Sequence, residues 1–228
     1  MPLKPITDTA LLGDRAYSAI RDAILHLELE PGAPLVESQL ARALNASKTP
    51  VREALCRLEE TGLVVSTPYR GFVVSELTLH DAWEILQIRA VLEGLAVREA
   101  CEALTETDLE ALAALLEEQR AYLEQGELDA CAESGYAFHR ILVEKAGNSR
   151  LCESIDRLND QFHRVRLLSS HIPGRLPKSL VEHHEILEAL RERDEALAER
   201  RMNDHLLAVY EDVAQDGHLK PEEQVVSP

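Results

Sequence analysis

The stretch SKTPVREALCRLEETGLVVSTPYRGFVVS, residues 47–75, decides the fold of the first part of the chain. Ser47 is a residue type that caps helix N-termini, and Pro50 stands at the third helical position, where a missing amide hydrogen costs nothing. Gly62 ends the helix. Its apolar face is formed by Val51, Leu55 and Leu58. The pattern predicts a helix with one buried face and one cationic face.

Two β-branched segments follow this helix, Leu63–Ser66 and Gly71–Ser75, and the turn residues 67–70 separate them. They predict a two-stranded hairpin. Upstream, the apolar spacing predicts helices over Asp14–Leu29, which Pro31-Gly32 ends, and over Glu37–Leu44. Three short helices and a hairpin indicate a winged helix-turn-helix over residues 1–76, with residues 1–9 as a flexible arm. Another small α+β domain is the alternative.

Every periodic segment after Ser75 is helical. Capping pairs stand at Thr78 with Asp81 and at Thr105 with Asp108, and Asn148 and Asp194 can cap later helices. The predicted helices run over residues 78–103, 105–126, 127–146, 149–171, 178–193 and 195–214. Six helices joined by short turns predict an all-helical antiparallel bundle over residues 77–214. We expect residues 215–228 to be a disordered tail, so the fold class is mainly α.

Composition limits the function. No 18-residue apolar run is present, so we expect no membrane span, and the first ten residues do not form a signal peptide. Four cysteines without a CxxC pair are expected as buried, reduced thiols of a cytoplasmic protein. The net charge of −17 opposes DNA binding, because phosphates repel an acidic protein. Residues 1–75, however, hold eight basic and nine acidic residues, so their net charge is only −1. The acidity therefore belongs to the second part of the chain.

These residues resemble a known family. The order and spacing of Pro31-Gly32, Leu40-Ala41, the segment 47–55, Gly62-Leu63-Val64 and Arg70-Gly71 are similar to the winged-helix signature of GntR-family regulators. The second part resembles the FCD ligand-binding domain of the FadR subfamily, and the resemblance covers about residues 12–210. The matching stretches there include Ile88-Arg89 with Leu92-Glu93, Phe138-His139, Ala146-Gly147-Asn148, Glu182-His183 and His205-Leu206.

The resemblance implies DNA binding by the third helix in the major groove and by the wing. Arg52 carries a planar guanidinium that suits guanine, and a helix N-terminus attracts phosphate. The family usually has Arg where this chain has Lys48, which we assign to phosphate positioning or a looser guanine contact. Arg57 is expected to be a solvated surface charge. Carried over by position, the DNA-contacting residues are Ser38, Ser47, Lys48, Thr49, Pro50, Arg52, Arg70 and Gly71. A single such head has few cations, so a homodimer that reads an inverted-repeat operator is expected.

Three of the nine histidines lie on separate predicted helices, at places where metal-binding FCD proteins supply ligands: His139, His183 and His205. Three imidazoles suit Zn²⁺ or another first-row divalent cation. Such proteins usually have Asp or Asn four residues before the first histidine, and this chain has Gly135 there. Three readings stay open: a metal held by three histidines, a metal completed by effector or water, and a metal-free pocket.

The resemblance also implies a small organic acid as effector. Arg89 with Glu93 matches a family pair near the cavity and can bind a carboxylate, although a purely structural Arg89–Glu93 ion pair is an equal alternative. Arg166 and Arg164 are weaker candidates. No nucleophile motif, phosphate-binding glycine loop or carboxylate behind the histidines is evident, so a regulator, commonly a repressor, is favoured over a helical metalloenzyme. An architectural DNA binder would leave the acidic domain unexplained.

Overall fold

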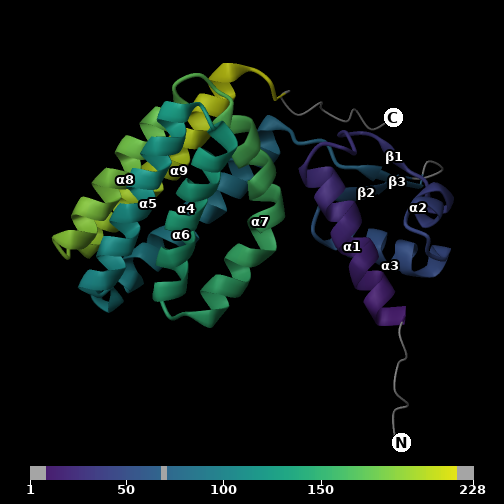
Figure 1. Ribbon diagram of the computed structural model, residues 1–228, viewed down its shortest axis with the longest axis horizontal. Helices are drawn as coiled ribbons and strands as arrows, with labels where there is room; N and C mark the ends of the chain where they lie inside the picture. Colours follow the sequence, from purple (N-terminus) through teal and green to yellow (C-terminus); the bar gives the residue numbers. More distant parts are fainter. Residues whose placement is uncertain (1–8, 68–70, 220–228) are drawn as a thin grey trace, which may run out of the picture. The chain divides into compact units, whose positions relative to one another are not determined.

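A computed structural model of the chain describes residues 9–67 and 71–219. The chain folds into two units, which divide between Leu77 and Thr78. Each unit has its own core. Figure 1 shows one unit of short helices with a small sheet and a second unit of long helices.

The first unit contains three helices and three strands. In chain order they are α1 (Thr9–Leu25), β1 (Pro34–Leu35), α2 (Glu37–Ala43), α3 (Lys48–Glu60), β2 (Val64–Thr67) and β3 (Gly71–Val74). The antiparallel sheet has the strand order β1-β3-β2. Val64 pairs with Val74 and Thr67 with Gly71, so the predicted hairpin is present. The fold class predicted for this unit, a winged helix-turn-helix, is confirmed, and the two-residue strand β1 adds to it.

The core of this unit explains the sequence pattern of α3. Val51, Leu55 and Leu58 are fully buried, and they pack with Ile20 and Ile24 of α1. The opposite face of α3 is left to polar and charged side chains.

Two details of the prediction are wrong. Helix α1 ends at Leu25 rather than at Leu29, and Leu27 adopts a positive φ of 59°, which a continuing α-helix does not allow. Ser47 has the extended backbone of a capping residue, but its side chain makes no capping hydrogen bond.

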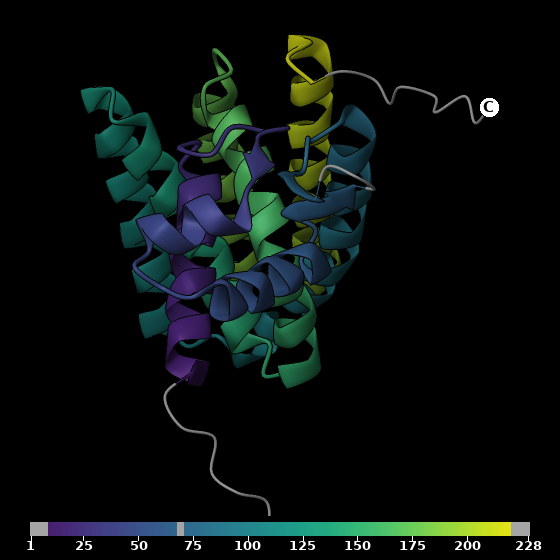
Figure 2. The same ribbon diagram turned by 90° about the vertical axis from the view of Figure 1, so that its right-hand side faces the viewer.

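The second unit consists, in its described residues, of six helices that lie side by side (Figures 1 and 2). They are α4 (Leu79–Ala103), α5 (Glu106–Gln125), α6 (Leu128–Lys145), α7 (Ser149–Ser170), α8 (Arg175–Arg191) and α9 (Glu195–Asp216). Helix α4 packs along α9, and α5 packs against α6 and α8. The predicted all-helical bundle is confirmed.

The predicted caps of this unit are present. Thr78 with Asp81 and Thr105 with Asp108 form reciprocal capping boxes, in which the side chain of each residue bonds the backbone of the other. Asn148 and Asp194 accept backbone amide hydrogens at the starts of α7 and α9. These hydrogen bonds satisfy amides that have no partner within the helix.

Helix bounds differ from the prediction at two places. Helix α8 begins at Arg175, three residues earlier than predicted, because Pro177 occupies its third position rather than breaking the chain. Helix α9 continues to Asp216, so the first two residues of the predicted tail are helical, and residues 220–228 lie outside the described part. The predicted arm lies outside it too, except for Thr9, which begins α1.

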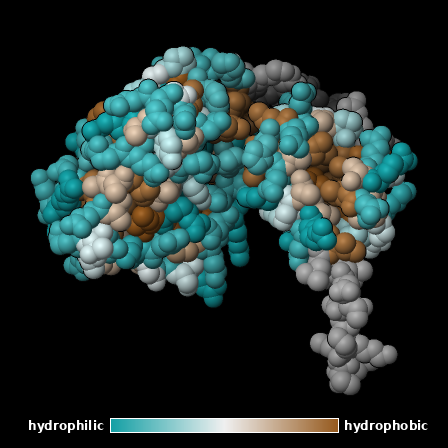
Figure 3. Space-filling view, in the orientation of Figure 1, coloured by the Kyte–Doolittle hydropathy of each residue, from teal (hydrophilic) through white to brown (hydrophobic). Residues whose placement is uncertain are grey.

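The surface and the cysteines complete the description. Hydrophilic residues cover most of the visible face of the helical unit, with a hydrophobic patch among them (Figure 3). Among the described residues, no helix combines the length and the apolar composition that crossing a bilayer requires. The cysteines are free thiols, as expected, but the prediction that all are buried is wrong, because Cys56 is exposed on α3.

Candidate functional site

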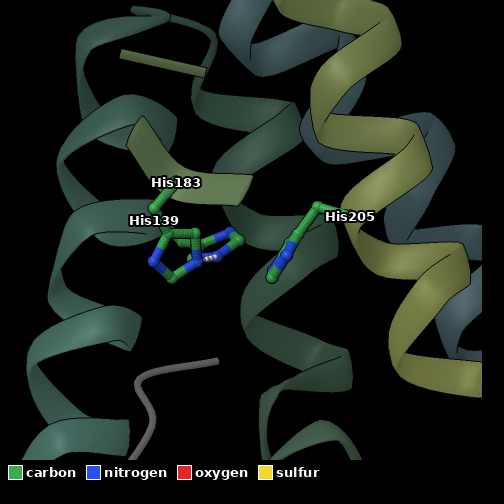
Figure 4. A group of neighbouring side chains, drawn as sticks. All are labelled: His139, His183 and His205. Atoms are coloured by element: carbon green, nitrogen blue, oxygen red, sulfur yellow. Dashed lines mark hydrogen bonds between the residues drawn. The ribbon is translucent and has the colours of Figure 1, made fainter. Parts of the chain in front are cut away.

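Three buried histidines meet in the interior of the helical unit. His139 lies on α6, His183 on α8 and His205 on α9, and the rings point toward one another (Figure 4). One nitrogen from each ring lies within 4.8 Å of one nitrogen from each of the others. All three residues are at most 5% exposed. The three histidines selected from the sequence therefore form one cluster.

Each imidazole is oriented by a different oxygen acceptor. Nδ1 of His139 lies 2.6 Å from a carboxylate oxygen of Glu93, and Nδ1 of His205 lies 2.7 Å from one of Glu182. Nδ1 of His183 lies 3.1 Å from the amide oxygen of Gln119. Ionised carboxylates and amide oxygens only accept hydrogen bonds, so each Nδ1 donates its hydrogen outward. A neutral imidazole with its hydrogen on Nδ1 has its lone pair on Nε2, and the Nε2 atoms of His139 and His183 face each other at 3.1 Å.

Burial keeps two of these imidazoles neutral. It lowers the pKa of His183 well below the usual value, and the neighbouring His205 and His139 act in the same direction. Burial also lowers the pKa of His205 to about 4, against the opposing effect of its hydrogen bond to Glu182. A neutral imidazole is the form that binds a metal ion.

A carboxylate that stays ionised supports His139. Burial raises the pKa of Glu93, but Arg89 and His139 outweigh this effect and lower it to about 2. Arg89 is fully buried, donates from Nε to Glu93 at 2.5 Å, and lies 3.7 Å above the ring centre of Phe162. Arg89 and Glu93 thus form a buried ion pair behind His139.

A second charged group lies behind His205. Glu182 is bound there by Arg175, which is 2% exposed and also donates to Asp212 at 2.6 Å. Burial raises the pKa of Glu182, but the hydrogen bond from His205 and the charge of Arg175 lower it overall. An imidazole held by a carboxylate in this way is the usual arrangement around a metal ligand.

Sequence reasoning missed Gln119, Glu182 and Arg175. Gln119 lies on α5, and its partner His183 is 64 residues further along the chain, so spacing gives no signal. Glu182 directly precedes His183 in the chain, but it binds His205 on another helix, so adjacency gives no signal of its role. The expectation that no carboxylate lies behind the histidines is wrong, because Glu93 and Glu182 both do.

A cavity adjoins the histidines. It is partly open to solvent and is lined by residues of α5, α6, α7, α8 and α9. The three histidines share its lining with Gln119, Tyr136, Phe162, Arg166, Ser169 and Arg175. Arg89 and Glu93 do not line it. Of the arginines selected from the sequence, Arg166 does, although it is held by Glu133 at 2.7 Å and by the carbonyl of Ala132 at 3.1 Å.

The chemistry of this cluster fits a divalent cation. Two nitrogens bound to one tetrahedral zinc at about 2.0–2.1 Å would lie ~3.3 Å apart, close to the 3.1 Å between the facing Nε2 atoms of His139 and His183. Two lone pairs at that distance repel unless a metal cation, or a hydrogen carried by one of the two rings, lies between them. Gly135, one helical turn before His139, offers no ligand. The donor set is therefore three imidazoles, with further positions toward the cavity.

The second candidate site is the N-terminal end of α3. Ser47, Lys48 and Thr49 are exposed there, and the Arg52 side chain is 71% exposed, with Glu37 of α2 at 3.9 Å. Ser38 is exposed on α2. A helix N-terminus with two exposed cationic side chains attracts phosphate.

The remaining predicted DNA contacts differ in their placement. Pro50 is buried, so it shapes the first turn of α3 rather than presenting a side chain. Gly71 is exposed with a φ of 74°, a conformation that favours glycine, and Arg70 lies outside the described residues. Arg57 is exposed at the surface, as expected, where it binds Asp14 at 2.7 Å and stacks on Tyr17.

A winged helix-turn-helix joined in one chain to an all-helical domain with a histidine-lined cavity defines a class of protein, the one-component transcription regulators. Comparison with known proteins agrees. The family model of the bacterial regulatory proteins of the gntR family matches residues 12–74, and that of the FCD domain matches residues 84–208.

Individual relatives are similar along most of their length. The HTH-type transcriptional repressor RspR of Escherichia coli K12 is 32% identical over 212 residues, which are 92% of each chain. The HTH-type transcriptional regulator McbR of the same strain is 34% identical over 170 residues, 73% of this chain and 76% of McbR. A solved structure of E. coli McbR/YncC superposes with a TM-score of 0.73 at 28% identity, covering 90% of this chain and 98% of that chain. The chain belongs to the GntR family of bacterial transcription regulators and carries an FCD domain. It is a DNA-binding regulator, not an enzyme.

Proposed function

We propose that the protein is a homodimeric, cytoplasmic repressor whose operator affinity is set by a small organic acid bound in the cavity of the helical domain, beside a divalent metal held by His139, His183 and His205. The observation that carries this proposal is the orientation of the three buried imidazoles. Each turns its Nδ1 hydrogen to an outer oxygen, which leaves the Nε2 lone pairs for a cation.

A bound divalent cation would supply Lewis-acid coordination for a carboxylate of the effector. The chain's own residues supply orientation and charge. Glu93 and Glu182 hold two imidazoles and offset the positive charge of a cation, and Arg175 holds Glu182 in turn. Arg166 and Arg175 line the cavity, where a guanidinium could exchange its present carboxylate partner for an organic anion.

DNA would be read by the N-terminal half of α3. Arg52 suits a guanine edge in the major groove, and the hydroxyls of Ser47 and Thr49 suit phosphates. Lys48 is a point charge and would position the backbone. Gly71, with Arg70 before it, would bring the wing close to the sugar-phosphate backbone. The acidic helical domain repels DNA and restricts contact to the winged unit.

Exposed apolar residues on α4 support dimerisation through the helical domain. Ile88 is 48% exposed and Val91 is 67% exposed, one turn apart on the same helix. Two exposed β-branched residues on one helix face favour contact with another protein surface. The double variant Ile88→Glu/Val91→Glu should sediment as a monomer. Val181→Glu is the matched control, since Val181 is 60% exposed on α8, and this variant should sediment like the parent protein.

The experiment that tests the ligand proposal is a screen of small organic acids for thermal stabilisation of the full chain, with and without Zn²⁺. A ligand that binds only the folded state raises the melting temperature, by an amount that grows with its concentration. We expect stabilisation by an acid that requires Zn²⁺ and is lost in His139→Ala. Stabilisation that is equal without Zn²⁺ would instead establish a metal-free effector pocket, and no bound metal in the parent protein would reject the metal site.

A further inference from the structure

We propose that Gln119 is a positioning residue of the histidine cluster, and that Gly135 is glycine because the Gln119 amide occupies the space next to it. This inference rests on the proposed metal site for its consequence, but the positioning itself is a property of the metal-free protein.

The Gln119 side chain is held at both ends. Gln119 lies on α5 and is 1% exposed, and its amide oxygen accepts a hydrogen bond from Nδ1 of His183 at 3.1 Å. The amide also hydrogen-bonds the buried thiol of Cys131 on α6. A buried amide with partners on both sides has one preferred orientation. Gln119 therefore presents its oxygen, and not its nitrogen, to the imidazole.

This orientation decides which nitrogen of His183 can bind a metal. An oxygen acceptor at Nδ1 keeps the hydrogen there, so the lone pair lies on Nε2 and faces His139 Nε2. Glu93 and Glu182 do the same for the other two histidines, but with charge. Gln119 is the neutral member of the three outer partners, which leaves the cluster one negative charge short of a set with three carboxylates.

Gly135 is the complement of this arrangement. A Cβ at position 135 would lie 2.8 Å from the Gln119 amide nitrogen and 3.2 Å from Cε1 of His183. A side chain there would push the amide away and break its contact with His183. Glycine is unfavourable inside a helix, and position 135 lies in the middle of α6. Position 135 on α6 thus leaves room for Gln119, which reaches His183 from α5.

The first test uses two variants at one position. In the metal-free full chain, the ¹⁵N chemical shifts of the histidine rings should show His183 with its hydrogen on Nδ1. Gln119→Leu should shift it toward the other tautomer or a mixture and lower Zn²⁺ affinity by about 10- to 100-fold, the usual effect of removing an outer partner. Gln119→Glu keeps an oxygen at the same place and should retain both the tautomer and the affinity.

The second test uses the space at position 135. Gly135→Ala should lower Zn²⁺ affinity in the parent protein, although alanine favours the helix more than glycine does. In a Gln119→Ala background, where the amide is absent and only the 3.2 Å contact with His183 Cε1 remains, Gly135→Ala should cause a much smaller further loss. A merely destabilising substitution would lower affinity equally in both backgrounds.

The outcomes separate the two proposals. A parent protein that binds no Zn²⁺ overturns the metal site, and the tautomer of His183 then decides the role of Gln119 alone. An unchanged His183 tautomer in Gln119→Leu, or equal losses from Gly135→Ala in both backgrounds, overturns the positioning role.

Discussion

Acidification should weaken the metal-free protein through His205. Burial holds the pKa of this imidazole at about 4, whereas in the unfolded chain it titrates at 6.5. Between these values the unfolded chain takes up a proton that the folded protein does not, so the stability is fully present above pH 6.5 and is lost as the pH falls toward 4.

The magnitude follows from the two pKa values. From about pH 8 to about pH 5, His205 alone should lower the free energy of unfolding by about 2 kcal/mol. His183, whose pKa is also lowered, acts in the same direction. Glu93 does not contribute in this range, because its pKa is about 2 and it stays ionised in both conditions.

Urea unfolding of the EDTA-treated protein measures this loss. The single tryptophan, Trp83, packs on Tyr210 at 4.8 Å between ring centres, so its fluorescence reports on the helical domain. His205→Gln removes the titrating group and should lose about 2 kcal/mol less than the parent between the two pH values. His80→Gln, at a half-exposed histidine, should lose as much as the parent. An equal loss in the parent and in His205→Gln would show that protonation of His205 does not cause the loss of stability.

Three further substitutions test the fold. Glu93→Gln leaves the buried guanidinium of Arg89 without a charged partner and should lower the free energy of unfolding in urea by about 3–5 kcal/mol. Glu144→Gln, in an exposed ion pair with Arg140, should lower it by less than about 1 kcal/mol. Similar losses in the two variants would contradict the buried ion pair. Leu55→Ala, in the core of the winged unit, should lower the free energy of unfolding, followed by circular dichroism, by about 2–5 kcal/mol. Leu12→Ala, at a leucine that is 41% exposed, should lower it far less. A Leu55→Ala variant as stable as the parent would mean that Leu55 is not in the core. Thr78→Ala removes a capping box and should lower stability by about 1 kcal/mol, measured by calorimetry, which a variant as stable as the parent would disprove.

The elements that depend on local patterns were predictable from the sequence. The hairpin and α3 follow from residues close in the chain, as do the capping boxes at Thr78 and Thr105. The start of α8 was missed because Pro177 was read as a break, although proline suits the first turn of a helix. Strand β1 is two residues long and carries no periodicity that a sequence pattern can display.

The candidate site was predictable only in part. The three histidines could be selected by position, but the groups that orient two of them could not, because Gln119 and Glu182 act across helix packing rather than along one helix. Arg89 and Glu93 are indicated by the resemblance to the family, but the sequence does not distinguish a ligand contact from the ion pair that supports His139. Only the packing of α4 against its neighbours separates these alternatives.

We propose that the exposed N-terminal half of α3 reads DNA. The most direct test is the affinity of the full chain for a duplex that it enriches from a random library. An arginine that contacts guanine contributes roughly 1–3 kcal/mol to the free energy of binding. Because Arg52→Ala removes this contact from both subunits of a dimer, it should weaken DNA binding at least about 30-fold. Arg57→Ala, on the same helix but engaged with Asp14 and Tyr17, is the matched control and should change affinity by less than about threefold. Equal affinities for Arg52→Ala, Lys48→Ala and the parent protein would contradict the claim.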